Sequence, residues 1–566
     1  MRVKEQKNGF SAHLISGTNT VMFGLDADEN ARKGLLGFAI KKIKGTHESW
    51  LKGFKTFEAT TPANHVPGTL YESNSQPIQD FTWSDYLAEP GTTYTYKIYP
   101  VKGTPNNLEL KEPVEVTIDT EDPAKGKHGI YFNMGAIASQ GFTRRFNSVG
   151  PTEEEKNNPN NEKVKWLSRG LLEAALGFIS QANSNEYALR IAAYEFTYKP
   201  IMDAFMKAHQ KGADVKVIYE AGNKDGKPTS TTSSNNKKIE DYGFDKHLLI
   251  KRTNRDNIPH NKFIVLLKNN KPISVLTGST NFTPSGFLGQ SNVVHIVRDQ
   301  DIADCYLKYW EILKTDPKRD VARKKINKIA PYPPDELAPN SITPIFSPRA
   351  KSKMLDWYAT KIESAKQTVL FTAAFGVNKR LAEKFAIDKK FLRFVVMERK
   401  SKSEAVRKMM RMDTDVQIAL GEKLNTTILK HKFDGWELDD WFQKEEHYRK
   451  RGMVFYVHTK YLIIDVLSED PLICSGSANF STNSLLSNDE NMLLIRGDKR
   501  VADIYLNEFM RLFRHFYFRD FMRRMIDENI PSSEKPGYLE PNPKKWLEKH
   551  FTKGRFNTKR RELFKG

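Results

Sequence analysis

The feature that most constrains this chain is a pattern of polar residues that occurs twice with one internal spacing. One copy spans residues 458–479 and contains, in order, His458, Lys460, Asp465, Gly476, Ser477 and Asn479. The other copy spans residues 260–281 and contains His260, Lys262, Gly278, Ser279 and Asn281. In both copies 18 positions separate the histidine from the glycine, so the copies superpose at an offset of 198 residues. Because one spacing governs both copies, the chain is expected to contain a duplicated fold.

The duplication continues around these motifs as helices that alternate with apolar strands. In the first half the periodicity predicts helices over 167–181 and 200–210 and strands over 188–196 and 215–219. In the second half it predicts helices over 354–365 and 379–385 and strands over 368–375 and 391–397. This alternation predicts a duplicated α/β fold, with two mixed-sheet lobes related by a pseudo-twofold axis. Residues 221–238 and 316–328 are expected to be irregular, because polar and basic residues dominate them.

The first 120 residues have a different pattern, that of short strands separated by turns. Aromatic residues alternate after the turn Pro90-Gly91, at Tyr94 and Tyr96, which is typical of a corner in an all-β sandwich. This segment resembles a fibronectin type III module, in which a tyrosine after such a turn caps the corner. The chain is thus expected to be multidomain, with a sandwich over 1–122, lobe 1 over 128–330, lobe 2 over 340–525 and a basic C-terminal tail over 526–566.

The charge balance indicates a polyanionic partner. Lysine and arginine number 89 against 69 acidic residues, a net charge of +20. Nucleic acid, and DNA before RNA, is the favoured partner; an anionic membrane surface and a generally basic protein are the alternatives. The two cysteines, Cys305 and Cys474, form neither a disulfide framework nor a zinc cluster. The sequence has no secretory signal and no apolar run long enough to span a membrane, so a soluble, cytoplasmic protein is expected.

The repeated motifs resemble those of the phospholipase D superfamily, in which H-x-K-x4-D is followed by G-S-x-N and occurs twice in each active unit. The resemblance covers residues 128–525 and rests on both motifs and their shared spacing. It implies one active site at the interface of the lobes and a phosphodiesterase reaction through a covalent phosphohistidine. It also implies that neither a metal ion nor another cofactor takes part.

The residue types agree with this chemistry. Imidazole attacks phosphorus and, when protonated, supplies a proton to a leaving oxygen, so His260 and His458 are the expected nucleophile and acid. Negative charge on the phosphoryl oxygens requires fixed donors, which are expected from Lys262, Lys460, Asn281 and Asn479. The hydroxyl groups of Ser279 and Ser477 are expected to contact the substrate. Glu195, at the end of a predicted strand, is a further candidate.

The two copies are not equivalent. The position that corresponds to Asp465 is Leu267, and the position that corresponds to Glu490 is Asn292. If each histidine pairs with the group in its own copy, Glu490 favours a protonated His458 and Asn292 leaves His260 neutral. His260 is then the nucleophile and His458 the general acid. Tyrosyl-DNA phosphodiesterases, a branch of the superfamily, are similar, since their motifs lack the aspartate and their histidines have unequal partners. Asn292 and Asp465 are grouped with the substrate-binding candidates, although Asp465 is expected to bond mainly to backbone.

Three functional hypotheses follow. The first is a nuclease or DNA-end-processing phosphodiesterase; the second is a phospholipase D or transphosphatidylase acting on membrane lipids. The third is a scaffold without catalytic activity, because the first motif is degenerate at Leu267 and Asn292. The N-terminal module is expected to bind a protein partner or to form a homo-oligomer. Trp436 and Trp441 are candidates for contact with bases or lipid, with packing inside a loop favoured, and His295 is expected to lie in the core.

Overall fold

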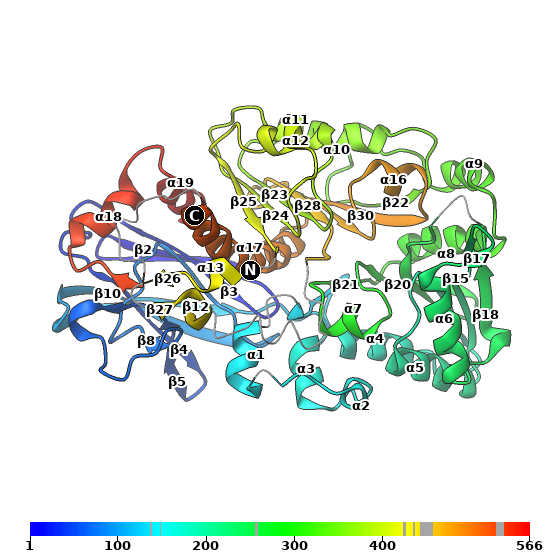
Figure 1. Cartoon of the computed structure of the whole chain (residues 1–566), viewed down its shortest axis with the longest axis horizontal. Coiled ribbons are helices and arrows are strands. Elements are labelled where there is room, and N and C mark those ends of the chain that lie inside the picture. The colour runs from blue at the N-terminus through cyan, green and yellow to red at the C-terminus, as the bar shows by residue number, and fades with distance from the viewer. Residues whose placement is uncertain are drawn as a thin grey trace.

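The structure is a computed structural model of the chain. It describes residues 1–135, 139–147, 149–254, 258–422, 426–433, 436–441, 457–527 and 537–566. Figure 1 shows a β-rich part (blue) at one end of the molecule and two α/β lobes (cyan to orange) at the other. The side chains of Trp436 and Trp441 lie outside the described residues, and so does the segment 442–456 that precedes the second histidine motif.

The N-terminal part is an all-β sandwich. In the described residues, one sheet has the order β1-β2-β3-β9, with β1 (Arg2–Lys7), β2 (Phe10–Ser16), β3 (Val21–Ala27) and β9 (Thr82–Asp85). The other contains β4 (Gly37–Lys44), β5 (His47–Trp50), β10 (Thr93–Thr104), β11 (Asn107–Leu110) and β12 (Val114–Asp119). Alternating residues of β10 and β12 are buried, as a half-buried strand requires.

The two tyrosines after the Pro90-Gly91 turn both close this corner. The backbone N–H of Glu89 donates to the hydroxyl of Tyr94 over 2.9 Å, and the hydroxyl of Tyr96 donates to Asp85 over 2.8 Å. Both rings are buried in the core between the sheets. The predicted sandwich and its tyrosine-capped corner are therefore present.

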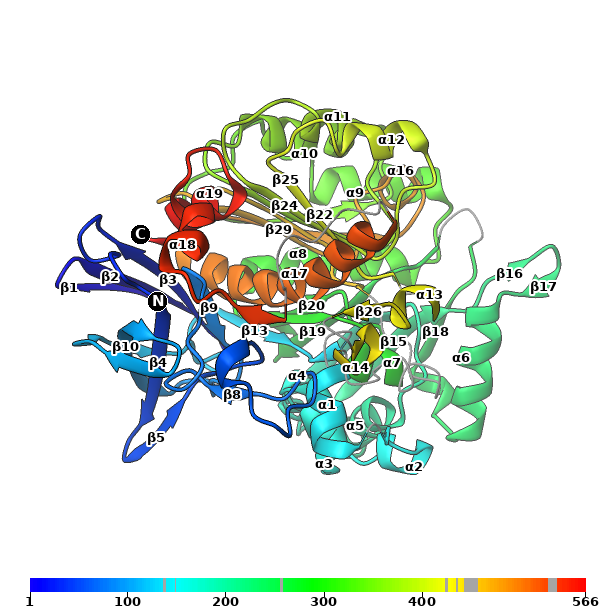
Figure 2. The same cartoon turned by 60° about the vertical axis from the view of Figure 1, so that its left-hand side comes forward.

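The C-terminal segment is not the extended tail that its charge indicated. Residues 537–566 form β31 (Tyr538–Leu539), α18 (Pro543–Phe551) and α19 (Phe556–Phe564), which pack on the sandwich (Figure 2). The indole of Trp546 is buried there and donates to the carbonyl of Leu35 over 2.6 Å. Arg560 pairs with Asp80 over 2.7 Å. Lys544, Lys545 and Arg555 are exposed, whereas Arg561 is buried and pairs with Asp26. The segment thus forms two short amphipathic helices, a periodicity that composition alone did not reveal.

Lobe 1 is built around a mixed sheet. Within the described residues its order is β13-β21-β20-β19-β14-β15-β18. The strands are β13 (His128–Phe132), β14 (Tyr187–Ala193), β15 (Asp214–Glu220), β18 (Leu249–Arg252), β19 (Lys262–Lys268), β20 (Lys271–Gly278) and β21 (Val293–Val297). The main helices are α3 (Glu162–Ser168), α4 (Leu171–Ser180), α5 (Lys199–Gln210), α6 (Ser230–Asp241), α7 (Pro284–Leu288), α8 (Gln300–Lys314) and α9 (Arg319–Ile329).

Lobe 2 has a sheet of the same order, β22-β30-β29-β28-β23-β24-β25 over its described part. The strands are β22 (Ile342–Ser347), β23 (Val369–Ala373), β24 (Arg393–Met397), β25 (Val416–Leu420), β28 (Tyr461–Ile464), β29 (Leu472–Gly476) and β30 (Glu490–Arg496). The helices include α10 (Lys353–Ser364), α11 (Lys379–Phe385), α12 (Glu404–Met409), α16 (Thr482–Leu486) and α17 (Lys499–Asp527). The alternation predicted for both halves is therefore observed.

Three predicted elements differ from the structure. The Ser- and Thr-rich stretch expected to be a loop contains α6, because the Thr229 hydroxyl caps its N-terminus and Ile239 is buried. The basic stretch between the lobes contains α9, whose Ala322 and Ile326 are buried while its charges face solvent. The helix predicted over 167–181 is broken at Arg169 and Gly170, which adopt positive φ angles of 52° and 89°.

The lobes meet through apolar packing and buried polar contacts. One core contains side chains from both lobes. Across the interface Arg252 pairs with Asp489 over 2.9 Å, and both are almost fully buried. His295 lies in the core, as predicted, and its Nδ1 is 3.1 Å from the hydroxyl of Tyr505 on α17. Helices in the described part of the chain are all too short or too polar to cross a membrane.

Candidate active site

Both motif histidines lie at the interface of the lobes, each just before a central strand. His260 precedes β19 and His458 precedes β28. The neighbouring residues connect the lobes, since Ser291 forms a β-bridge with Val457 and the N–H of Asp489 donates to the carbonyl of Ile258 over 2.9 Å. The two motifs are 198 residues apart in sequence, but the fold brings them into one site.

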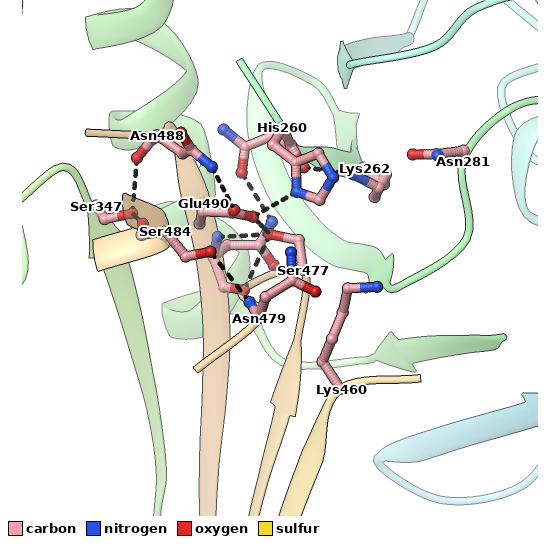
Figure 3. Close-up of polar contacts among 12 residues, drawn as sticks. His260, Lys262, Asn281, Ser347, Lys460, Ser477, Asn479, Ser484, Asn488 and Glu490 are labelled. Atoms are coloured by element: carbon pink, nitrogen blue, oxygen red, sulfur yellow. Dashed lines mark hydrogen bonds and ion pairs between the residues drawn. The ribbon is translucent and has the colours of Figure 1, made fainter. Parts of the chain in front are cut away.

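Each histidine bonds to the partner residue of the other lobe. The Nδ1 of His260 lies 2.9 Å from Oε2 of Glu490 (Figure 3). The Nδ1 of His458 lies 2.8 Å from Oδ1 of Asn292. The expectation that Glu490 holds His458 and Asn292 holds His260 is therefore wrong. Asn292 directly precedes β21 and Glu490 begins β30, and each reaches across the interface to the histidine of the other lobe. The spacing of residues within one copy could not indicate this exchange of partners.

The motif serines hold the groups that orient the imidazoles. Ser477 donates to Oε2 of Glu490 over 2.6 Å, and Ser279 donates to Oδ1 of Asn292 over 2.8 Å. Both serine side chains are fully buried. Asn488 adds a further bond to Glu490 over 3.2 Å. These contacts correct the expectation that the serine hydroxyls face the substrate, because they are already engaged with the histidine partners.

The side chains of both motif lysines are buried. The Nζ of Lys262 donates to the carbonyl of His260 over 2.6 Å, and Lys460 makes the equivalent bond to His458. In Figure 3 the side chains of Lys262, Lys460 and Asn281 border a space to one side of His260. Burial lowers the pKa of Lys262 to about 8, and burial together with the charge of Lys262 holds the pKa of Lys460 well below its usual range. An anion in this space would interact strongly with both groups.

The two motif asparagines border the same space but have different surroundings. The NH₂ group of Asn281 donates to the carboxylate of Glu195, which lies two residues beyond β14. Burial raises the pKa of Glu195, and the charge of Lys262 opposes that effect. The amide oxygens of both Asn281 and Asn479 are buried without a hydrogen-bond partner in the described structure. Each amide can therefore rotate to present its NH₂ group to an anion.

The environment makes both imidazoles reluctant to carry charge in the empty site. Burial lowers the pKa of His260, and the carboxylate of Glu490 opposes that effect. Burial holds the pKa of His458 well below its usual value, and the charges of Lys460 and Lys262 lower it further. A bound phosphodiester anion would favour the protonated form of either ring.

One aromatic residue of the site was not among the sequence-based candidates. The ring centroid of Tyr194 lies 5.0 Å from that of His260, and the Nζ of Lys262 lies 5.3 Å from the tyrosine ring. The hydroxyl of Tyr194 accepts a bond from Thr231 on α6. Its position in the sequence, next to Glu195 at the end of an apolar strand, could have identified Tyr194 as a candidate site residue.

Asp465 lies away from this space, at the opposite end of β28 from His458. Its carboxylate accepts from the backbone N–H groups of Lys366, Gln367 and Thr368. Leu267 is buried at the corresponding end of β19. Asp465 therefore has a structural role and does not bind substrate, which corrects its grouping with the substrate-binding candidates. The first copy has Leu267 in place of this aspartate, and its catalytic groups keep their positions.

The side chains around the site suit an anion better than a metal ion. Among the residues that the structure describes, no three histidine, cysteine, aspartate or glutamate side chains gather in a way that could hold a metal ion. The groups that face an anion in the site are ammonium, imidazole and amide groups.

Comparison with known proteins places this site in a wider context. Residues 178–313 and 359–513, together about half of the chain, match the family described as "Cardiolipin synthase, PLD-like domain". A phospholipase D from Rickettsia typhi is 28% identical over 132 residues, which are 23% of this chain and 58% of that protein. A phosphatidylserine synthase structure from Haemophilus influenzae covers 64% of this chain and 91% of its own, with 12% identity and a TM-score of 0.42. Yeast tyrosyl-DNA phosphodiesterase covers 57% of this chain and 85% of its own, with 13% identity and a TM-score of 0.29.

Proposed function

Since this chain belongs to the phospholipase D superfamily, we propose that it is a phosphodiesterase that acts on nucleic acid through a phosphohistidine intermediate. The observation that carries the proposal is the pairing of His260 with Glu490 and of His458 with Asn292, beside two buried lysines. The equal strand order of the two lobes also supports an ancestral duplication, and the tyrosine corner supports a fibronectin type III-like module.

In the first step the Nε2 of His260 attacks phosphorus. A bond forms between that nitrogen and phosphorus, and the bond to the leaving oxygen breaks. Protonated His458 donates its proton to the leaving oxygen and becomes neutral. The new phosphoimidazolium keeps its Nδ1 proton, which is directed at the carboxylate of Glu490. This carboxylate fixes the tautomer and stabilises the positive ring, as a carboxylate does beside a catalytic histidine.

In the second step water replaces His260 on phosphorus. His458 accepts a proton from the water, the water oxygen bonds to phosphorus, and the nitrogen–phosphorus bond breaks. His260 returns to its neutral form and His458 is again protonated. No external reactant besides water is needed, because the proton donated in the first step is recovered in the second.

The histidine roles agree with those expected from the sequence, but for a different reason. A carboxylate partner stabilises the charge that His260 acquires as a phosphoimidazolium. The amide partner of His458 stabilises positive charge less, and so protonated His458 gives up its proton more readily. The unequal partners therefore favour attack by His260 and proton donation by His458.

The remaining groups stabilise the phosphoryl oxygens. Lys262 and Lys460 are buried donors beside the site, and Asn281 and Asn479 can turn their NH₂ groups toward the phosphoryl oxygens. Ser279 and Ser477 act as positioning residues, because they hold Asn292 and Glu490 against the imidazoles.

Nucleic acid is favoured as substrate because the net charge of +20 suits a polyanion. The alternative, a phospholipase or transphosphatidylase, has support from the names of the Rickettsia relative and the Haemophilus structure. The experiment offers purified protein single-stranded and plasmid DNA, RNA, and vesicles of phosphatidylcholine and phosphatidylglycerol, all in EDTA. Cleavage of nucleic acid that is lost in His260→Asn and His458→Asn is expected. Release of head groups without nucleic-acid cleavage would contradict the proposal, and inactivity in both assays would favour the scaffold hypothesis.

A further inference from the structure

A large aromatic side chain is exposed next to the candidate active site. Phe375 lies two residues beyond β23 and is 67% exposed. Its counterpart in lobe 1 is Glu195, because Ile191 pairs with Ile264 on β19 as Phe371 pairs with Leu462 on β28. Where lobe 1 directs a buried carboxylate at Asn281, lobe 2 presents a ring to solvent. A single exposed apolar side chain is common on protein surfaces, so the position of this ring beside the site and its surroundings decide its significance.

Hydrogen bonds connect Phe375 to His458 through the adjacent loop. The carbonyl of Ala373, at the end of β23, accepts from the N–H of Glu398 over 3.2 Å. The carboxylate of Glu398 in turn accepts from the N–H of Val457 over 2.8 Å, and Val457 directly precedes His458. Phe375 and His458 therefore lie at the same edge of the lobe 2 sheet, and the loop after β24 connects their segments.

The loop beside Phe375 is strongly basic. A methyl group at Gly376 would lie 3.7 Å from the Cα of Ser401, so the loops after β23 and β24 are in contact. Around Ser401 the exposed cations are Arg399, Lys400 and Lys402. The acidic residues nearby are already engaged, since Glu398 accepts from Val457 and Glu404 pairs with Lys408 over 3.2 Å. The loop thus presents cations beside an exposed ring.

We propose that Phe375, Arg399, Lys400 and Lys402 form an aromatic–basic platform that binds single-stranded nucleic acid next to the scissile phosphodiester. An aromatic ring accepts any unpaired base by stacking, and lysine and arginine side chains follow the phosphate backbone. A duplex keeps its base faces covered, so the platform selects unpaired strands. The proposal rests on the proposed function and adds to it the strand state of the substrate.

The first test measures the affinity for single strands in a His260→Asn background, which keeps the substrate intact. Phe375→Leu keeps apolar area but removes the stacking ring, and Phe375→Trp keeps a stacking ring. Phe375→Leu is expected to weaken binding of an oligothymidylate roughly tenfold relative to the parent. Phe375→Trp is expected to bind it as tightly as the parent does. An oligomer of abasic residues should bind Phe375→Leu and the parent equally. Phe521→Leu, a partly exposed phenylalanine on α17, is the matched control and should change neither affinity.

The second test measures the salt dependence of the same binding. Removal of Lys400 and Lys402 together should reduce the slope of log Kd against log salt by about 0.7 for each phosphate group that the two lysines neutralise. Lys390→Ala is the control, because Lys390 is exposed at the opposite end of β24. It should leave the slope unchanged.

The outcomes separate this inference from the proposed function. Equal oligothymidylate binding by the parent, Phe375→Leu and Phe375→Trp would overturn the platform, even if the wild-type protein cleaves DNA. Loss of vesicle binding in Phe375→Leu with unchanged oligonucleotide binding would overturn it in favour of a membrane contact. Failure of the wild-type protein to cleave any nucleic acid would instead count against the proposed function. Thermal unfolding of each variant checks that the fold is intact.

Discussion

Replacing His458 by asparagine should separate the two chemical steps. The proposed role of His458 is to protonate the leaving oxygen, which matters only when that oxygen is a poor leaving group. A dinucleotide expels an alkoxide and needs the proton, whereas 4-nitrophenolate is stable without one. General acid catalysis contributes roughly 10²–10⁴-fold, so kcat/KM for a dinucleotide should fall by about that factor. Release of 4-nitrophenolate from a thymidine 4-nitrophenyl phosphodiester should slow by less than about tenfold.

The assay is rapid mixing of enzyme and nitrophenyl ester under single-turnover and multiple-turnover conditions. In His458→Asn one equivalent of nitrophenolate per active site should appear as a burst, and turnover should then stop because the second step lacks its base. His260→Asn is the control and should give no burst, because its asparagine cannot form the phosphoenzyme. Circular dichroism and thermal unfolding check that both variants fold.

The pH dependence supplies an independent test of the same role. Burial and the charges of Lys460 and Lys262 hold the pKa of His458 well below its usual value in the free enzyme. The protonated fraction, and with it kcat/KM for a dinucleotide, should therefore fall about tenfold per pH unit above neutrality. Below pH 8, where Lys262 still keeps its proton, release of nitrophenolate from the ester should not show this decline. A burst that survives in His260→Asn and disappears in His458→Asn would reverse the roles, and equal losses on both substrates would refute the reasoning.

Four further outcomes are expected. Glu490→Gln should lower kcat about 10²–10⁴-fold with little change in KM, because the charge that stabilises the phosphoimidazolium is lost. Asn292→Asp should move the basic limb of kcat/KM to higher pH, because a carboxylate raises the pKa of His458. Lys262→Met should abolish activity but stabilise the protein by up to about 3 kcal/mol at neutral pH, since burial lowers the lysine pKa from 10.5 to about 8. Wild-type stability should rise between pH 8 and 10.5, where the unfolded chain binds the extra proton, and this rise should be smaller in the variant, in which Lys460 alone still contributes. Trp546→Ala should cost about 3–5 kcal/mol in urea unfolding.

Matched variants make these outcomes specific. Lys268→Met lies at the exposed end of the same strand β19 and should not stabilise the protein. Trp50→Ala removes a partly exposed indole from the sandwich and should cost less than the loss of Trp546. A Glu490→Gln variant with full activity would show that the carboxylate is not needed on His260. An unshifted pH profile in Asn292→Asp would place the basic limb on another group.

The sequence was most informative where a pattern was repeated. The shared spacing of the motifs predicted a duplicated fold, and the periodicity around them predicted the strands of both halves. That His260 and His458 share one site was implied by the resemblance to the phospholipase D superfamily. The sequence could not predict which partner reaches which imidazole. Glu490 and Asn292 are each close in sequence to one histidine and bonded to the other, and only the packing of the lobes decides that choice.

Composition was the weaker guide. It assigned 221–238 and 316–328 to irregular structure and 526–566 to a basic tail, although each contains a helix. A helix with one narrow buried stripe needs few apolar residues, such as Ile239 on α6 or Ala322 and Ile326 on α9. The average hydropathy of such a stretch is polar, and an average does not show the periodicity that defines the helix.

The packing of α18 on the sandwich has a consequence for the order of folding. The sandwich strands are synthesised before either lobe, yet Trp546 and Leu547, which complete their core, are synthesised after both. During translation, part of the apolar surface of the sandwich therefore stays exposed until Trp546 and Leu547 have been synthesised. Two ion pairs accompany the completion of this core. Arg561 of the C-terminal segment pairs with Asp26 of the sandwich, and Arg2 of the sandwich pairs with Asp503 of lobe 2. Assembly of the catalytic interface and closure of the N-terminal domain are thus expected to be late, coupled events.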